Sequence, residues 1–541
     1  MINVTDLGLP AMNVMTWVLA ISPVALILVL MMGLKVSGAR SGIIAWVLTA
    51  AIVYFVFGGN STIIASGTVK GFWSTLFVLY IIWTSMFMYN VVKITGAFDV
   101  IAAKFTEMTN GNRILQLLIL GWCFPTFIQG VCGFGVPVAV ATPLLIGLGF
   151  DPLVSCTTAL LGHSWGIAFG SLGSMYSVII GNSPIETVMP GAAAFWGSIF
   201  VAFGGLMVGF CILHLYGAKI MKNVGKAFAE GSIAVLFLSA VMGAALIGTC
   251  FAAPYLGCFV AGAVGLVAGV VVLPKLPAYA PVAGQEVEQN TTWGSFLVNF
   301  SAYLILVVVV FGALLITPVK NALNSVLVVG LAFPETSLAT GFTNAATGSY
   351  SALKLLTTPG TLIIVSAFLA IAFYKSKGMM PAGGVKEAWT NTVKQSTGST
   401  TTIIPMTMMA ILMTEGGLTQ YIAYGLAAVA GNFYPILAPF IALLGGFVTS
   451  SGTSSNILFT GLQYSVADVL GISPAIILAQ QSASAALSNS FSPANCALGT
   501  GVSGQSGREG EILASTGMYN MIQSTLIGIL GFVLCTMGMG F

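Results

Sequence analysis

Apolar stretches alternate with short polar segments along nearly the whole chain. A helix that crosses the hydrocarbon core of a bilayer needs about 20 apolar residues, so the pattern predicts an all-α polytopic membrane protein. The expected spans are residues 12–33, 41–58, 70–93, 152–180, 190–217, 232–253, 255–274, 295–317, 355–374, 396–414, 474–500 and 514–538. Two of them, 152–180 and 474–500, are interrupted by LLGHSWGIAFGSLGS (160–174) and SASAALSNSFSPANC (482–496), so we expect both to be broken transmembrane helices.

Lys and Arg residues concentrate in some of the connecting segments, such as 35–40, 93–113, 219–226 and 375–394. Because basic residues are retained on the cytoplasmic side, we place these segments inside the cell, and the N-terminus and residues 318–352 outside. Arg113 and Asp151 then both lie inside, so residues 114–150 must enter and leave the membrane on one side as a re-entrant hairpin. Its tip is predicted within FPTFIQGVCGFGVPVAVATPLLIGLGF (124–150).

The second half of the chain repeats this plan. KITGAFDVIAAKF (93–105) corresponds to EGGLTQYIAYGL (415–426), FIQGVCGFGVP (127–137) to FVTSSGTSSN (447–456), and LGFDPL (148–153) to LGISPA (470–475). The charge pattern makes the second hairpin, 434–470, enter from outside, so the repeats are inverted, as in secondary transporters. We expect N-terminal helices in 1–69, a first repeat in 70–217, scaffold-type helices in 218–395 and a second repeat in 396–541.

Composition agrees with a membrane protein and excludes other classes. Hydrophobic residues make up 57% of the chain and charged residues 6%, with a mean hydropathy of +1.00, whereas soluble domains carry about 25% charge. The net charge of +3 gives no reason to expect a nucleic-acid partner, and the eight cysteines show no metal-binding or disulfide spacing. The first apolar run lacks the features of a cleaved signal peptide, so we interpret it as a membrane helix. We expect a multi-pass protein of the plasma membrane, and we expect it to need no cofactor or metal.

The four breaks define the candidate binding site. Irregular backbone at membrane depth is tolerated where it is buried in protein or lines a cavity, and the starts of half-helices attract anions. No Lys or Arg lies in the breaks, so dipoles, hydroxyls and amides must hold the anion. The substrate-binding candidates are Gln129, Gly130, Gly133, Gly135, His163, Ser164, Ser451, Gly452, Thr453, Ser454, Ser455, Asn456, Ser490, Ser492 and Asn495. The candidates for a coupling ion are His163, Glu415, Thr449, Ser450 and Asn489.

Several of these residues also have a purely structural interpretation. Glycines in membrane helices often mark close packing, which competes with a binding role for Gly133 and Gly135. A histidine within a span suggests a proton carrier, but His163 could equally be a hydrogen-bonded core residue. The run of hydroxyls at 449–455 exceeds what packing requires and favours binding.

These segments resemble the L-lactate permease family. The resemblance is carried by GWCFPTFIQGVCGFGVPVAVATPLLIGLGFDPL (121–153) and GGFVTSSGTSSNILFTGLQ (445–463), and it extends to ITGAFDVIAAKF (94–105) and SFSPANCALGTGVSGQSGREGEI (490–512). It implies a bacterial or archaeal inner-membrane symporter of lactate, glycolate or related 2-hydroxymonocarboxylates, usually driven by protons. It also implies the elevator-type architecture of the ion-transporter superfamily, in which the scaffold domain often forms a homodimer.

Two departures from the family pattern bear on coupling. Members typically carry an acidic residue at the position of Gln129, and a small polar, proline-containing run where this chain has GHSWGIAFGS (162–171). The leading hypothesis is H⁺-coupled symport of a lactate-like anion. Without the acid, the hydroxyls of TSSGTSSN (449–456) and hairpin carbonyls offer a Na⁺ site. The alternatives are therefore a Na⁺-coupled transporter of a different small carboxylate or sulfonate, or an anion channel. No catalytic motif indicates an enzyme.

Overall fold

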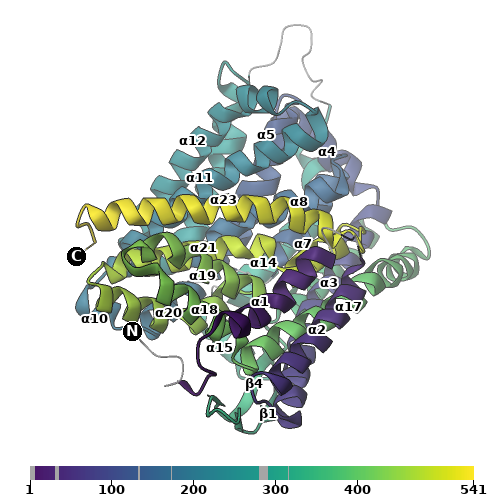
Figure 1. Ribbon diagram of the computed structural model, residues 1–541. Helices are drawn as coiled ribbons and strands as arrows, with labels where there is room; N and C mark the ends of the chain where they lie inside the picture. Colours follow the sequence, from purple (N-terminus) through teal and green to yellow (C-terminus); the bar gives the residue numbers. More distant parts are fainter. Residues whose placement is uncertain are drawn as a thin grey trace.

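The computed structural model describes residues 7–30, 34, 36–131, 135–171, 173–279, 290–314 and 316–540, most of them in helices (Figure 1). The N-terminal part contains α1 (Val14–Leu28) and α2 (Gly38–Phe55). A first series follows: α3 (Ser61–Ile94), α4 (Ala97–Met108), α5 (Arg113–Leu118), a π-helical turn (Ile119–Cys123), α6 (Phe124–Val131), α7 (Val136–Gly147), α8 (Pro152–Ser164), a 3-10 turn (Trp165–Phe169), α9 (Ser174–Gly181), α10 (Ile185–Val188) and α11 (Ala192–Tyr216).

The middle of the chain contains α12 (Val224–Cys250), α13 (Gly257–Val267), α14 (Trp293–Leu314), α15 (Thr317–Asn324) and α16 (Pro359–Ser376). A second series then runs through α17 (Gly384–Glu415), α18 (Leu418–Ala430), α19 (Tyr434–Thr449), α20 (Gly452–Leu470), α21 (Pro474–Leu487), a 3-10 turn (Ser488–Phe491), α22 (Pro493–Val502) and α23 (Glu509–Thr536).

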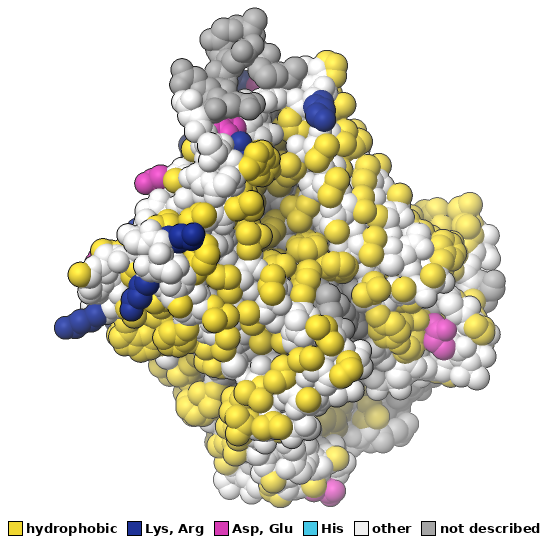
Figure 2. Space-filling view, turned by 180° about the vertical axis from the view of Figure 1, so that it is seen from behind, with side chains coloured by type: hydrophobic (Ala, Val, Ile, Leu, Met, Phe, Trp, Pro, Cys, Tyr) yellow, Lys and Arg dark blue, Asp and Glu magenta, His cyan; other side chains and the backbone are white. Residues whose placement is uncertain are grey.

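Fewer continuous spans occur than the sequence pattern predicts. Within the described residues, six helical segments are long and apolar enough to cross a membrane, or up to seven if a bent pair counts as one: Gly38–Phe55, Ala192–Met221, Val224–Cys250, Pro254–Lys275, Trp293–Leu314 and Glu509–Thr536, with Met86–Ile94 and Ala97–Met108 as the bent pair. The expected spans 152–180 and 474–500 are both broken into shorter helices, as predicted. Hydrophobic side chains predominate on the surface seen in Figure 2, which shows few charged ones. Such a surface suits contact with lipid chains.

The same order of elements occurs twice. In each series a long helix (α3 or α17) is followed by a short helix (α4 or α18), two helices separated by a break, and a helix interrupted by a 3-10 turn. Both short helices begin after a glycine in the left-handed region, Gly96 at φ 71° and Gly417 at φ 76°. Glycine adopts this conformation at little cost, so the short helix can leave the long one at a sharp angle.

One region departs from the all-α expectation. Between α15 and α16, β1 (Val328–Phe333) pairs with β4 (Thr347–Lys354), and β2 (Thr336–Ser337) pairs with β3 (Thr343–Asn344), both antiparallel. The sequence pattern predicts a loop over residues 318–352, because short strands in a polar connection lack the length and alternation that reveal a strand. The chain is therefore mostly helical rather than all-α.

Helix packing brings distant segments together around the breaks. The two helices of the second pair, α19 and α20, pack on each other and on α21, and α20 also contacts α9 of the first series. In the same way α22 contacts both α7 and α8. Elements of the two series therefore interlock where their helices are interrupted.

Candidate functional site

The two broken helices are interrupted in the same manner. After α8, the 3-10 turn leads to Gly170 in an extended conformation (φ −85°, ψ 175°) before α9 begins. After α21, the second 3-10 turn leads to extended Ser492 (φ −105°, ψ 145°) before α22 begins. An extended residue ends the i→i−4 hydrogen bonding, so backbone groups at both breaks need other partners or a ligand.

The break between α19 and α20 lies in the serine run. Ser450 adopts the left-handed conformation (φ 54°), and Ser451 caps α20, its Oγ accepting a hydrogen bond from the Ser454 N–H at 3.2 Å. The Thr449 hydroxyl lies 2.7 Å from the Gly445 carbonyl oxygen and 3.0 Å from that of Ser451. Since one hydroxyl hydrogen can serve only one of these oxygens at a time, Thr449 retains some freedom at the turn.

Asn495 connects this turn to the second broken helix. Its side-chain nitrogen lies 2.9 Å from the main-chain oxygen of Asn489 and 3.4 Å from that of Ser450. Asn489 in turn donates to the carbonyl oxygens of Ala485 and Ala486, at 3.0 and 3.1 Å. The predicted coupling-ion candidates Ser450 and Asn489 are thus brought together through Asn495.

The starts of α9, α20 and α22 lie around this junction, and the start of α7 packs on α22 further along that helix. Gly135, the left-handed residue that starts α7, packs on Leu498 of α22. Gly452 at the start of α20 packs on Met175 in the first turn of α9. The first helical bond of α20 joins Ser455 N to Ser451 O, and that of α22 joins Cys496 N to Ser492 O. The N–H groups of Gly452, Thr453, Ala494 and Asn495 precede these bonds, so they have no partner within their own helix. Converging helix starts favour an anion.

A chain of buried amides runs from α20 through α21 and to α9. Asn456 donates to the Met175 carbonyl oxygen at 3.3 Å, and its own Oδ1 accepts from Gln481 Nε2 at 3.2 Å. Gln481 Nε2 also lies 3.2 Å from Ser455 Oγ, and Gln481 Oε1 accepts from Gln463 at 3.0 Å. The four side chains are fully buried, so this network fixes the first turns of α20 relative to α9 and α21.

Gln129 occupies the corresponding place in the first series. It is buried on α6, its main-chain oxygen accepts from Ser171 N at 2.7 Å, and its Nε2 lies 3.4 Å from Ser171 Oγ. Its Oε1 is buried and has no hydrogen-bond partner among the described residues. An unpartnered buried acceptor is costly, which makes this oxygen a candidate contact for a proton donor or a cation.

His163 and Ser164 lie at the end of α8. The His163 ring is buried, and its Nδ1 lies 3.0 Å from the Ala159 carbonyl oxygen. Because a carbonyl oxygen only accepts, Nδ1 carries the hydrogen and Nε2 is left as an acceptor. Ser164 donates to the Leu161 carbonyl oxygen at 2.8 Å. His163 thus has one nitrogen bound within its own helix and one available to accept a proton.

Glu415 belongs to a different cluster from the other candidates. Its carboxylate forms a buried ion pair with Lys70 at 2.7 Å, and its main-chain oxygen accepts from Asn344 at 2.8 Å. The Lys70 ammonium also lies 5.3 Å from the ring centroid of Phe333 and 5.2 Å from that of Tyr350. Within the described residues these contacts link α3, α17 and the strands, and they do not reach the helix starts.

The remaining candidates divide into accessible and packed residues. Thr449, Ser450, Ser451, Thr453, Ser454 and Asn495 are half-buried, whereas Ser455, Asn456, Ser490 and Ser492 are buried. Ser490 accepts from Asn520 of α23 at 2.8 Å. Gly130 faces α13, since a Cβ there would lie 2.3 Å from Phe259 Cα, so it serves close packing. Gly133 lies outside the described residues.

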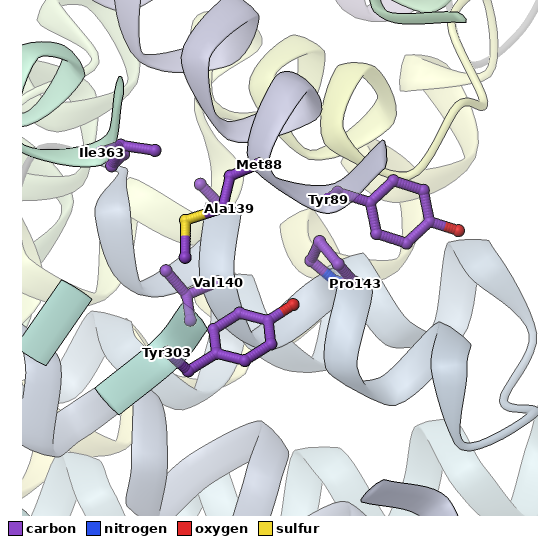
Figure 3. Close-up of a pocket in the computed structure, with 7 residues that line it drawn as sticks. All are labelled: Met88, Tyr89, Ala139, Val140, Pro143, Tyr303 and Ile363. Atoms are coloured by element: carbon purple, nitrogen blue, oxygen red, sulfur yellow. The ribbon is translucent and has the colours of Figure 1, made fainter. Parts of the chain in front are cut away.

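A small cavity lies where α7 packs on α3, α14 and α16. Met88, Tyr89, Ala139, Val140, Pro143, Tyr303 and Ile363 line it, as Figure 3 shows. Its volume of about 10 Å³ has room for one water at most. The Tyr303 hydroxyl is buried there without a hydrogen-bond partner among the described residues. The cavity is too small for a substrate. It shows that α7 is not tightly packed against α3, α14 and α16 at this point.

Sequence reasoning missed three residues of the amide network. Gln463 and Gln481 were not among the candidates, and neither was Tyr434, whose hydroxyl donates to Gln463 at 2.7 Å. A signal was present, since AQQS (479–482) places two amides within an expected span. Polar side chains at membrane depth generally need partners.

These features define a multi-pass membrane protein with a polar junction built from interrupted helices. The sequence model of one family, described as L-lactate permease, matches residues 16–538. The chain therefore belongs to the L-lactate permease family. It is 28% identical to glycolate permease GlcA of Escherichia coli (strain K12), with 94% of each chain covered. It is 26% identical to the L-lactate permease of Streptococcus iniae, over 88% of this chain and 96% of the relative.

The L-lactate permease of Escherichia coli (strain K12) is likewise 26% identical, over 96% of each chain. A crystal structure of the Alcanivorax borkumensis YdaH transporter aligns with a TM-score of 0.31 at 16% identity, covering 87% of this chain and 88% of the other. That score is too low to define a shared fold. Family membership and the apolar helices make the protein a multi-pass transporter of the cell membrane, rather than an enzyme.

Proposed function

We propose that the protein is a secondary active transporter that carries a small 2-hydroxymonocarboxylate, such as L-lactate or glycolate, together with a cation, most simply H⁺. The family and the named activities of the relatives support this substrate class. The observation that carries the proposal is the convergence of the starts of α9, α20 and α22 on the serine turn and Asn495. This is an anion site built without Lys or Arg.

In this proposal the carboxylate binds between the starts of α20 and α22. The N–H groups of Gly452, Thr453, Ala494 and Asn495 supply donors, and the positive ends of the helix dipoles compensate the charge. The 2-hydroxyl group of the substrate contacts the half-buried hydroxyl of Ser454 or the Asn495 amide. A site of this kind binds one carboxylate with a short polar tail and has no cationic side chain for a second carboxylate.

We further propose that the element series form inverted repeats, that α5–α7 and α19–α20 are re-entrant hairpins, and that transport follows an elevator mechanism. Supporting this, both series have the same element order, and their interrupted helices interlock. The contact of α7 with α3, α14 and α16 encloses a small cavity beside an unpartnered tyrosine hydroxyl (Figure 3). Few polar bonds between described residues hold α7 to these helices at this cavity, which is compatible with movement of α7 along them in an elevator mechanism. The scaffold helices in 218–395 are the proposed site of homodimer formation.

Two groups are suited to carrying the coupling ion. For H⁺, the His163 Nε2 can take up the proton, and the unpartnered Gln129 Oε1 can accept a hydrogen bond from a proton donor. For Na⁺, the oxygens of Thr449, Ser450 and Asn489 cluster at the second hairpin, and hard cations prefer oxygen ligands. The alternative function is therefore Na⁺-coupled uptake of another small carboxylate or sulfonate.

The first test is uptake of radiolabelled L-lactate and glycolate into proteoliposomes, with an imposed proton gradient compared with an imposed sodium gradient. We expect accumulation under the proton gradient. Accumulation that requires sodium would transfer coupling to the Thr449–Ser450–Asn489 cluster. A lack of uptake of both substrates under both gradients would refute the substrate assignment.

A counterflow experiment separates a carrier from an anion channel. Proteoliposomes preloaded with unlabelled lactate should transiently accumulate external labelled lactate, because a carrier exchanges one bound substrate for another. A channel equilibrates both pools without such an overshoot. Unchanged chemical identity of the transported label, checked by chromatography, excludes enzymatic conversion.

A further inference from the structure

A charged pocket lies at one end of three helices, away from the junction described above. It is formed by the start of α8, the end of α11 with its terminal π-helical turn (Gly217–Met221), and the start of α23. Its volume is about 250 Å³. Lys219, Lys222 and Arg508 supply positive charges, and Asp151 and Glu511 supply negative ones. The charge pattern of the sequence places all three helix ends on the cytoplasmic side.

The negative groups of the pocket already have partners. Glu511 accepts from Arg508 at 2.7 Å and 3.1 Å. Asp151 caps α8, and its Oδ1 accepts from the N–H groups of Leu153 and Val154, both at 3.0 Å. Lys219 and Lys222 form no ion pair with any described residue. The pocket therefore presents two uncompensated positive charges.

The two lysines are held on a short, constrained connection. Asn223 N donates to the Gly217 carbonyl oxygen at 2.9 Å, and the Asn223 side chain caps α12. A Cβ on Gly217 would lie 2.7 Å from Val224 Cα, so α11 and α12 approach closely. Lys222 adopts a left-handed conformation at φ 54°, which is uncommon for a residue other than glycine and worth a functional explanation.

The pocket has apolar walls and a charged rim. Leu153, Val154, Leu215 and Ile512 line it and are buried. The apolar spans of α11 and α23 end here, so the pocket lies at the level where hydrocarbon meets water. A ligand that fits must combine an anionic group with an apolar part.

We propose that this pocket binds the phosphate group of an anionic phospholipid such as phosphatidylglycerol. Lys219 and Lys222 contact the phosphate, and the apolar walls contact the glycerol backbone and the start of an acyl chain. Basic pockets between membrane helices on the cytoplasmic side are suited to such headgroups, and each lysine near the surface contributes about 1 kcal/mol. Free inorganic phosphate shares the anionic chemistry but lacks the apolar part.

The test uses the purified full-length protein in neutral detergent. Native mass spectrometry measures binding of phosphatidylglycerol and phosphatidylcholine to three forms: the unaltered protein, Lys219→Gln/Lys222→Gln and Lys226→Gln. Lys226 is the matched control, because it lies one turn further on, is exposed and pairs with Glu230 at 3.7 Å. All three lysines are exposed, and equal melting temperatures will confirm that the variants fold.

We expect the double variant to lose about thirtyfold in phosphatidylglycerol affinity, since two lysine contacts are removed, while Lys226→Gln binds normally. Phosphatidylcholine should bind weakly to all three forms. Equal phosphatidylglycerol binding by all three, or an equal loss in both variants, would overturn the proposal. Full displacement of the lipid by inorganic phosphate would also overturn it, because it would identify a free phosphate site.

Discussion

Asn456 on α20 donates a hydrogen bond to the main-chain oxygen of Met175 on α9, across 3.3 Å and between the two halves of the chain. The same amide accepts from Gln481, and all of these groups are buried. This side chain therefore helps to fix the position of α20 relative to α9, together with the packing of Gly452 on Met175. A binding site formed between them depends on it too.

We predict that Asn456→Ala reduces lactate uptake about tenfold or more, because it removes the hydrogen bonds to the Met175 oxygen and from the Gln481 amide, each worth about 0.5–1.5 kcal/mol. Initial uptake rates in proteoliposomes with matched protein content will measure this. Asn182→Ala is the control, since Asn182 is exposed at the end of α9 and its side chain donates to the Val178 carbonyl oxygen of the same helix at 2.9 Å. Near-normal uptake by Asn456→Ala would remove this junction from the site.

A second prediction separates binding from capping in the serine run. Ser454 gives its main-chain N–H to Ser451 Oγ, so its hydroxyl is not part of the cap. Ser454→Ala should abolish or strongly reduce uptake with little loss of folded protein. Ser451→Ala removes the cap and should lower stability by about 1 kcal/mol. Thermal unfolding and uptake measured on both variants distinguish the roles, and normal uptake by Ser454→Ala would contradict its place in the site.

The location of the breaks could be predicted from sequence because each break has local causes. Gly170, Gly173, Ser492 and Pro493 stand where the helices are interrupted, and the turn at Ser450 lies within the predicted serine run. Glycine, proline and hydroxyl residues favour such conformations wherever they occur. The residues at each break were therefore sufficient to predict its position.

The partners of the buried polar groups could not be predicted in this way. Gln463 lies on α20 and Gln481 on α21, and only the packing of these two helices brings the side chains to 3.0 Å. Lys70 and Glu415 are far apart in sequence and meet only because α3 packs along α17. The local sequence pattern predicts the helix on which each polar residue lies, whereas helix packing determines which residue it bonds.

The unpartnered Oε1 of Gln129 leads to a third prediction. If Gln129 contacts the coupling ion, Gln129→Leu should lower uptake about tenfold, since a buried polar contact of this kind is worth about 1–3 kcal/mol. Gln129→Glu places a titratable carboxyl at the same position and should make uptake more strongly dependent on external pH. Both variants keep approximately the native side-chain volume. Unchanged rates and pH profiles in both would assign Gln129 to packing.

His163 provides the fourth prediction. Its Nδ1 is fixed by the Ala159 carbonyl oxygen, so Nε2 is the nitrogen that can gain and lose a proton during transport. His163→Ala should therefore change the pH dependence of uptake. His214→Ala is the control, because His214 lies on α11, outside both broken helices, and bonds the Tyr519 hydroxyl at 2.8 Å. If His163→Ala and the unaltered protein have identical pH profiles, His163 does not carry the proton and has a structural role.

The Lys70–Glu415 ion pair provides the fifth prediction, which decides whether Glu415 acts in coupling or in stability. Removing one partner of a buried ion pair leaves an uncompensated charge and costs about 3–5 kcal/mol, whereas removing both is often nearly neutral. Lys70→Met and Glu415→Gln should each lower the unfolding temperature, and Lys70→Met/Glu415→Gln should recover most of the loss. The ion gradients that drive uptake should be the same for the double variant as for the unaltered protein. If the double variant is stable but no longer responds to either gradient, the Lys70–Glu415 pair takes part in coupling and is not purely structural.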